Sequence, residues 1–205
     1  MKKIAFVFLI FLNFSSCTQK KIKFNDYIAS IKDYQYEMNV EFANQAGSPL
    51  TKEGLKDFTK LDFFAIDSTY KVVAKFELEK NPRLFEMATT TDRKPIYKTY
   101  GTATFNLGGK ALKLHIYQNQ DLIKKPDYIN HLFIPFTDQT NGNESYGGGR
   151  YMDVEIPIGE TIVIDFNKSY NPYCAYNDKY SCPIPPREND LAIAIKAGVK
   201  MYEKH

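Results

Sequence analysis

The clearest hairpin signal in the chain is IYKTYGTATFNLGGKALKLHIYQ, residues 96–118. Two runs rich in aromatic and β-branched residues flank a Gly108-Gly109 pair, and such runs are typical of β-strands. Paired glycines readily adopt the positive φ angles that a tight two-residue turn requires. The pattern therefore predicts two antiparallel strands, over residues 96–107 and 111–118, joined by a hairpin turn.

Strand signals continue on both sides of this hairpin. Six more segments of the same character lie between turn residues: 70–78, 84–90, 131–136, 148–156, 161–166 and 191–196. Eight short strands separated by turns are typical of an antiparallel β-sandwich or barrel. We therefore expect a mainly β fold with that architecture.

The region before the strands has a helical period instead. Apolar residues recur at three- and four-residue steps over residues 24–46, and Gly47-Ser48-Pro49 follows them. This pattern predicts one N-terminal amphipathic helix that ends at the glycine and proline. Residues 51–58 predict one more turn of helix. We expect the main helix to pack on one face of the β structure or to close one mouth of it.

The first 17 residues have the pattern of a bacterial export signal. Lys2 and Lys3 precede an apolar run over residues 4–14, and two small residues then lead to Cys17. The run has 11 residues, which is short of the roughly 20 that a membrane-spanning helix needs. A cysteine directly after small residues resembles a lipobox, with Phe14 where leucine is more usual.

The lipobox resemblance implies a signal peptide over residues 1–16, diacylglycerol and an acyl chain such as palmitate on Cys17, and a basic spacer over residues 17–23. Two or three lipid chains anchor a protein stably to a membrane. The expected location is the bacterial cell envelope, on the periplasmic face, because no acidic run follows Cys17. The alternative is an ordinary signal peptide with an incidental cysteine.

The composition argues for one domain and against nucleic acid as a partner. Removal of residues 1–16 takes away two lysines, so the 27 basic residues become 25 against 24 acidic residues. A chain so close to neutral offers no electrostatic basis for binding nucleic acid. Residues 24–205 suit a single β-rich domain with a sizeable core.

Polar residues crowd into irregular segments in the last third of the chain, where binding sites are often found. The candidates for binding a small polar or anionic ligand are Glu144, Tyr146, Gly148, Arg150, Asp165, Asn167, Asn171 and Asn189. The three glycines at 147–149 would form a backbone nest for a carboxylate or phosphate beside Arg150. Alternatively, they would let a strand pass tightly under neighbouring side chains.

Three functions remain open at this point. The first is ligand binding, in which tyrosines of these segments would line a pocket or stack on sugar rings. The second is a hydrolase that uses Glu144 and Asp165 as paired carboxylates. The third is a structural or interaction protein in which Arg150 pairs with a carboxylate and braces the fold. The sequence has no serine-nucleophile elbow and no His-Glu-x-x-His helix, and it identifies no cofactor and no catalytic residue.

Cys174 and Cys182 flank a short loop and admit three interpretations. In an oxidising compartment they would pair as a disulfide. They would also suit a metal, although Cys-x7-Cys is not a standard zinc spacing and further ligands such as His115 and His131 are scattered. The third interpretation is a reactive thiol beside a base. The prolines that follow Cys182 would fix an extended flap across one end of the β core.

An ordered series of motifs extends through most of this region. It includes TDR (91–93), FIPFTD (133–138), ESYGGGRY (144–151), DFN (165–167) and CPIPPREN (182–189). The series resembles the bacterial family catalogued as domain of unknown function 1684, over about residues 84–200. The resemblance implies membership of that family and implies no activity.

Overall fold

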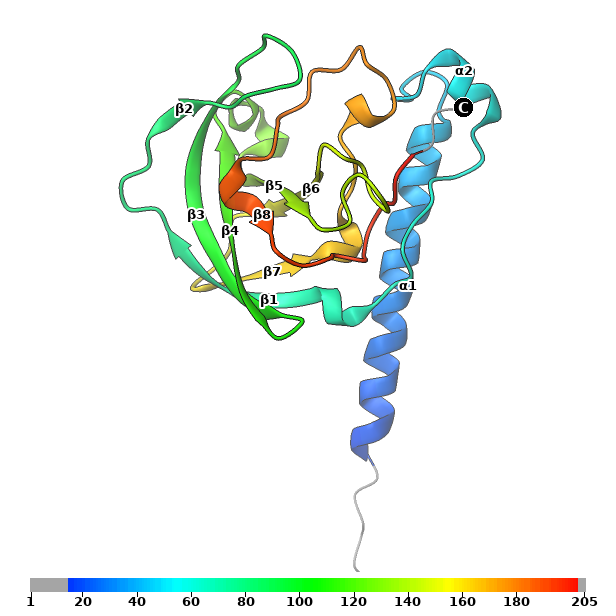
Figure 1. Ribbon diagram of the computed structural model, residues 1–205. Coiled ribbons are helices and arrows are strands. Elements are labelled where there is room, and N and C mark those ends of the chain that lie inside the picture. The colour runs from blue at the N-terminus through cyan, green and yellow to red at the C-terminus, as the bar shows by residue number, and fades with distance from the viewer. Residues whose placement is uncertain (1–14, 203–205) are drawn as a thin grey trace, which may run out of the picture.

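A computed structural model describes residues 15–202 (Figure 1). Two α-helices precede the sheet, α1 (Ser15–Ala43) and α2 (Lys52–Asp57). The strands are β1 (Lys71–Leu78), β2 (Leu84–Glu86), β3 (Ile96–Leu107), β4 (Lys110–Asn119), β5 (His131–Asp138), β6 (Arg150–Glu155), β7 (Thr161–Asp165) and β8 (Asp190–Leu191).

The strands form one sheet, which curves into a half-barrel (Figure 1). Its strand order is β6-β5-β4-β3-β1-β7, and all neighbours in this order are antiparallel. In addition, β2 pairs with β3 in the antiparallel sense, and β8 pairs with β5 in the parallel sense. Within residues 15–202, the end strands β6 and β7 are not paired with each other. The mainly β fold with one main N-terminal helix is therefore confirmed, whereas a sandwich or closed barrel is not.

The hairpin prediction is confirmed. β3 and β4 pair from Tyr97 opposite Asn119 to Leu107 opposite Lys110. Gly108 and Gly109, between them, have φ angles of +58° and +75°, which suit the left-handed conformation of a tight turn.

The last predicted strand is mostly wrong. β8 contains only two residues, and the segment that follows it does not continue as a strand. The carbonyl groups of Ile195 and Ala197 accept hydrogen bonds from the Arg150 side chain instead of from a neighbouring strand. The strand predicted over residues 84–90 is also shorter than expected, since β2 ends at Glu86.

A β-bulge in β3 changes the direction of its side chains. The register of the β3–β4 pairing shifts between Thr99 and Gly101. Because a bulge inserts one extra residue, Tyr97 faces the opposite side of the sheet from Ala103. At Gly101 a Cβ would lie 2.6 Å from the carbonyl oxygen of Glu77, so only glycine fits where β1 crosses this bulge.

Apolar side chains cover both faces of the sheet. The main core includes Leu132, Ile134, Phe136, Met152 and Ile164, which lie on one face. Alternate residues of the same strands point to the other face. There, a smaller cluster contains Met87, Tyr97, Tyr117, Phe133 and Tyr151. This second, tyrosine-rich face is the one on which the candidate site lies.

Helix α1 runs beside the half-barrel, and its N-terminal part projects beyond the sheet (Figure 1). Tyr27 donates a hydrogen bond to Asp165 at 3.0 Å, and Phe42 packs on Tyr176 with ring centroids 4.7 Å apart. The helix begins earlier than the predicted residue 24 and ends three residues before residue 46. α2 confirms the predicted extra turn, and Thr51 caps it by accepting from the Gly54 N–H.

Across residues 15–202, no helix combines the length and the apolarity that crossing a bilayer requires. The predicted signal peptide lies almost wholly outside the described residues, and Cys17 lies near the start of α1.

Candidate functional site

Arg150, the first residue of β6, is fully buried and ties three segments together. Its Nη2 lies 2.7 Å from Asp138 Oδ2 and donates to the Ile195 carbonyl at 2.7 Å, while Nη1 donates to Ala197. Burial lowers the pKa of Arg150, and the Asp138 carboxylate counteracts this effect. The guanidinium remains charged and is used inside the fold, so it is not available to a ligand.

Gly148 and Gly149, directly before Arg150, serve close packing. Gly149 has a φ angle of +88°, and a Cβ there would lie 2.6 Å from the Phe136 carbonyl oxygen. A Cβ on Gly148 would lie 2.5 Å from the ring of Tyr146. The steric explanation of these glycines therefore fits the structure, and the anion nest has no cation left beside it.

The structure does not bring Glu144 and Asp165 together. Glu144 forms an ion pair with Lys196 at 3.0 Å on the surface. Asp165, at the end of β7, accepts hydrogen bonds from Tyr27 and from the backbone N–H of Asn167 at 3.1 Å. The two carboxylates therefore have separate partners, and neither lines the cavity described below.

Two of the candidate asparagines hold the fold together. Asn189 accepts from the His115 N–H at 2.7 Å and donates to the Pro135 carbonyl at 2.7 Å. Asn167 accepts from the Asp67 N–H at 3.0 Å and donates to the Asp67 carbonyl at 2.8 Å. Both amides thus cross-link segments that are distant in the sequence.

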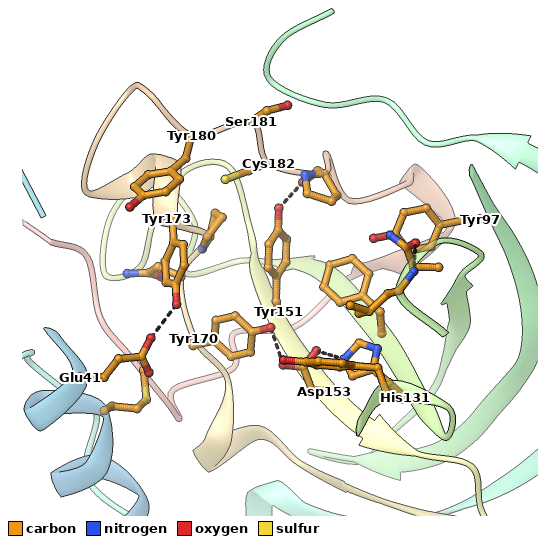
Figure 2. A pocket seen from close by; sticks show the side chains of 18 of the residues that line it. Glu41, Tyr97, His131, Tyr151, Asp153, Tyr170, Tyr173, Tyr180, Ser181 and Cys182 are labelled. Carbon is orange, nitrogen blue, oxygen red and sulfur yellow. Dashed lines mark hydrogen bonds and ion pairs between the residues drawn. The ribbon is translucent and has the colours of Figure 1, made fainter. Parts of the chain in front are cut away.

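A cavity of about 550 Å³ lies on the tyrosine-rich face of the sheet (Figure 2). Its walls come from α1, β3, β5, β6 and the segment 170–183. The aromatic side chains that line it include Tyr97, Phe133, Tyr151, Tyr170, Tyr173 and Tyr180. Of the ligand-binding candidates from the sequence, only Asn171 lines this cavity, and Cys182 of the cysteine pair does so as well.

Asp153 is the polar centre of the cavity wall. Its Oδ1 lies 2.9 Å from His131 Nε2, and its Oδ2 accepts a hydrogen bond of 2.6 Å from the Tyr170 hydroxyl. The Asp153 side chain is 46% exposed, so a ligand can reach it. Phe133 stands opposite Asp153 in the β5–β6 pairing, which places His131 diagonally across from Asp153 on the same face.

The tyrosine hydroxyl groups around this centre act as oriented donors. Burial raises the pKa of Tyr97, Tyr151 and Tyr170 above the usual tyrosine value. They therefore stay protonated at neutral pH. Tyr151 donates to the carbonyl of Pro183, and Tyr173 donates to Glu41 Oε1 at 2.7 Å, which connects the segment 170–183 to α1 (Figure 2).

The charges on the cavity wall do not favour an anion. Glu41 and Asp153 are negative and Arg93 is positive. Arg93 is already engaged, because its Nη2 donates to the Ser181 carbonyl at 2.7 Å and its Nε donates to the Ser181 hydroxyl at 3.1 Å. The wall therefore suits an uncharged ligand better than the anionic one that the sequence also allowed.

Two buried polar atoms of the cavity residues lack a partner. His131 Nδ1 and Asn171 Oδ1 make no hydrogen bond with the described part of the chain. Buried polar atoms are nearly always hydrogen-bonded in native proteins. Both residues line the cavity, but these two atoms are themselves buried beneath its surface.

Cys174 and Cys182 are free, buried thiols that contact each other. The Cys174 N–H donates to Cys182 Sγ at 3.2 Å, and the Tyr146 hydroxyl lies 3.8 Å from Cys174 Sγ. No group of three or more histidine, cysteine or acidic side chains that could hold a metal occurs within residues 15–202. The metal interpretation of this pair therefore finds no further ligands there.

Sequence reasoning missed Asp153 and gave His131 no partner. The alternation of side chains along the strands gave a signal for these two residues. Leu132 and Met152 are apolar, whereas their neighbours His131 and Asp153 are polar. Parity places both polar residues on the second face. The register of β5 against β6, which brings them into contact, is not readable from either strand alone.

Comparisons with known proteins agree with this fold. The family model described as a protein of unknown function (DUF1684) matches residues 56–200. The chain is also similar to an uncharacterized protein of Haloarcula marismortui with a solution NMR structure, at 34% identity and a TM-score of 0.69. That similarity covers 89% of this chain and 98% of the other. No curated protein matches the chain.

Proposed function

Because this chain belongs to the protein family of unknown function DUF1684, to which no activity is assigned, we propose a function from the cavity. The protein binds a small, uncharged polar ligand with a flat apolar face. A sugar-like ring that carries hydroxyl groups has this chemistry. The observation that supports this proposal is the aromatic-lined cavity of about 550 Å³ with the exposed Asp153 carboxylate in its wall.

The cavity has the parts that such a ligand needs. Ligand sites combine apolar walls with a few placed polar groups that fix the ligand's orientation. Here the tyrosine and phenylalanine rings would contact the apolar face of the ring. Asp153 would accept hydrogen bonds from hydroxyl groups, and its contacts with His131 and Tyr170 hold it in position.

We expect glucose and N-acetylglucosamine to shift NMR signals of the cavity residues, with Kd of the order of 1 mM, equivalent to about 4 kcal/mol. Asp153→Asn should raise that Kd about tenfold, since a hydrogen bond to a charged group is worth about 1.5–3 kcal/mol. The measurement is a 1H–15N titration of the full chain carrying Cys17→Ser in a sugar-free detergent.

Glu144→Gln is the matched control, because Glu144 pairs with Lys196 outside the cavity. This variant should bind both sugars with the same Kd as the parent chain. Inorganic phosphate should shift no NMR signal of the cavity residues in the variant or in the parent chain. The proposal fails if neither sugar shifts the cavity signals, or if Glu144→Gln weakens binding as much as Asp153→Asn does.

The same domain would be attached to the cell envelope through lipid on Cys17, as the lipobox resemblance implies. Expressed in a bacterium with a clickable palmitate analogue, the chain should incorporate the label and fractionate with membranes. Cys17→Ser should abolish labelling, since no other cysteine follows a small-residue export signal.

Cys182→Ser is the control for this labelling experiment and should retain the full label. Label that persists in Cys17→Ser would assign the acyl chain to another residue. An unlabelled parent chain, cleaved after the small residues, would indicate an ordinary signal peptide.

A further inference from the structure

The two free thiols lie at the base of a loop that forms part of the cavity wall. Cys174 belongs to the 3-10 helix Tyr173–Ala175, and the chain returns to it at Cys182. Between the cysteines, Tyr180 and Ser181 line the cavity, as does Cys182 itself. Figure 2 shows Tyr180, Ser181 and Cys182 along one side of it.

The backbone already holds the two cysteines in contact. The hydrogen bond from the Cys174 N–H to Cys182 Sγ, at 3.2 Å, places that sulfur against residue 174. Cys182 is fixed from its other side, because its carbonyl accepts from the Thr90 N–H at 2.9 Å and its N–H donates to Thr90 Oγ1 at 3.1 Å. A disulfide needs closely spaced backbones, and this arrangement supplies them.

The surroundings of the pair make the two sulfurs unequal. Hydrogen bonds from the Cys182 thiol and, secondarily, from Tyr146 lower the pKa of Cys174 to about 6, although burial opposes the shift. The hydrogen bond to Cys174 raises the pKa of Cys182. Cys174 is therefore the thiol of the pair that ionises more readily, and the thiolate is the reactive form in thiol–disulfide exchange.

We propose that Cys174 and Cys182 form a reversible disulfide that locks the loop 174–182 as a wall of the cavity. Each cysteine loses one proton and one electron as the Sγ–Sγ bond forms. A small-molecule disulfide such as oxidised glutathione takes up both electrons and both protons, and its own S–S bond breaks to give two thiols. Oxidation closes the loop covalently, and reduction lets it open. This device is independent of the ligand proposed above.

The test uses the full chain carrying Cys17→Ser in mild detergent, so that only the two loop thiols remain. After equilibration with oxidised glutathione, intact-mass analysis should show a folded monomer lighter by two hydrogen atoms. Trypsin cleavage after Lys179, which is exposed in the middle of the loop, should become at least about tenfold slower, because closure restricts local opening. Reduced glutathione should reverse both changes.

Cys174→Ser and Cys182→Ser serve as the controls, and neither should show the mass loss or a glutathione-dependent cleavage rate. The proposal is overturned if the folded chain keeps both thiols under conditions that oxidise the urea-unfolded chain. Separate glutathione adducts on each cysteine, or an unchanged cleavage rate after oxidation, would also overturn it. Glucose binding to the reduced chain tests the ligand proposal separately.

Discussion

Arg150→Ala is expected to lower the free energy of unfolding by about 3–5 kcal/mol, measured by urea denaturation. The substitution leaves Asp138 buried and charged without its partner. It also removes the side-chain donor to the Ile195 carbonyl and leaves the Ala197 carbonyl with Ser169 Oγ as its donor, at 3.3 Å. An uncompensated buried charge is costly, whereas the intact pair is nearly neutral relative to an apolar replacement.

Asp138→Asn and the double variant Arg150→Ala/Asp138→Asn complete a thermodynamic cycle with Arg150→Ala. Residues in one buried network couple strongly, so the double variant should lose less stability than the two single variants added together. A loss below about 1 kcal/mol in Arg150→Ala would show that the brace is unimportant. Weakened glucose binding at unchanged stability would instead return Arg150 to the list of ligand contacts.

Gly198→Ala is expected to cost about 2–5 kcal/mol of unfolding free energy, combining backbone strain and overpacking. Gly198 has a φ angle of +78°. A Cβ at this position would lie 2.5 Å from the Ser169 carbonyl oxygen and 2.8 Å from that of Phe166. Because both obstacles are backbone atoms, they cannot move aside cheaply. Thermal or urea unfolding of the variant measures the loss.

Gly159→Ala separates the two contributions. Gly159 has a similar φ angle of +90°, but nothing lies within 4 Å of a Cβ built there. This variant should lose only about 1 kcal/mol, the cost of the left-handed conformation alone. Equal losses at the two positions would mean that the close approach of Gly198 to residues 166–169 contributes nothing to stability.

Local features of this fold could be predicted from the sequence because their causes are local. The hairpin follows from the φ preference of Gly108 and Gly109, and α1 follows from its apolar period. The path of residues 192–196 depends instead on groups that are distant in sequence. Arg150 donates to the Ile195 carbonyl, and the side chain of Lys110 donates to the Ala192 carbonyl. The residue pattern of a strand does not show that its backbone carbonyl groups accept hydrogen bonds from a side chain distant in the sequence.

The sequence predicts a site in the last third of the chain around Arg150, whereas the cavity has Asp153 in its wall and also takes lining residues from α1, β3 and β5. The sequence predicts Arg150 as a ligand contact because it follows three glycines, yet its ion-pair partner is Asp138, in the FIPFTD motif. Asp153 carries no local signal apart from its parity, and its importance arises where β6 meets His131 and Tyr170. Such convergence depends on register and loop path, which are tertiary properties.

The projecting start of α1 would set the distance between the domain and a bilayer under the proposed lipid attachment at Cys17. Its first described contact with the sheet is made by Tyr27, and its first cavity residue is Tyr34. At about 1.5 Å per residue, Tyr34 lies about 25 Å along the helix axis from Cys17. With the proposed lipid on Cys17, the helix would act as a stiff spacer between the membrane and the cavity. A ligand would then arrive by diffusion through water, and no lipid tail would need to leave the membrane to reach it.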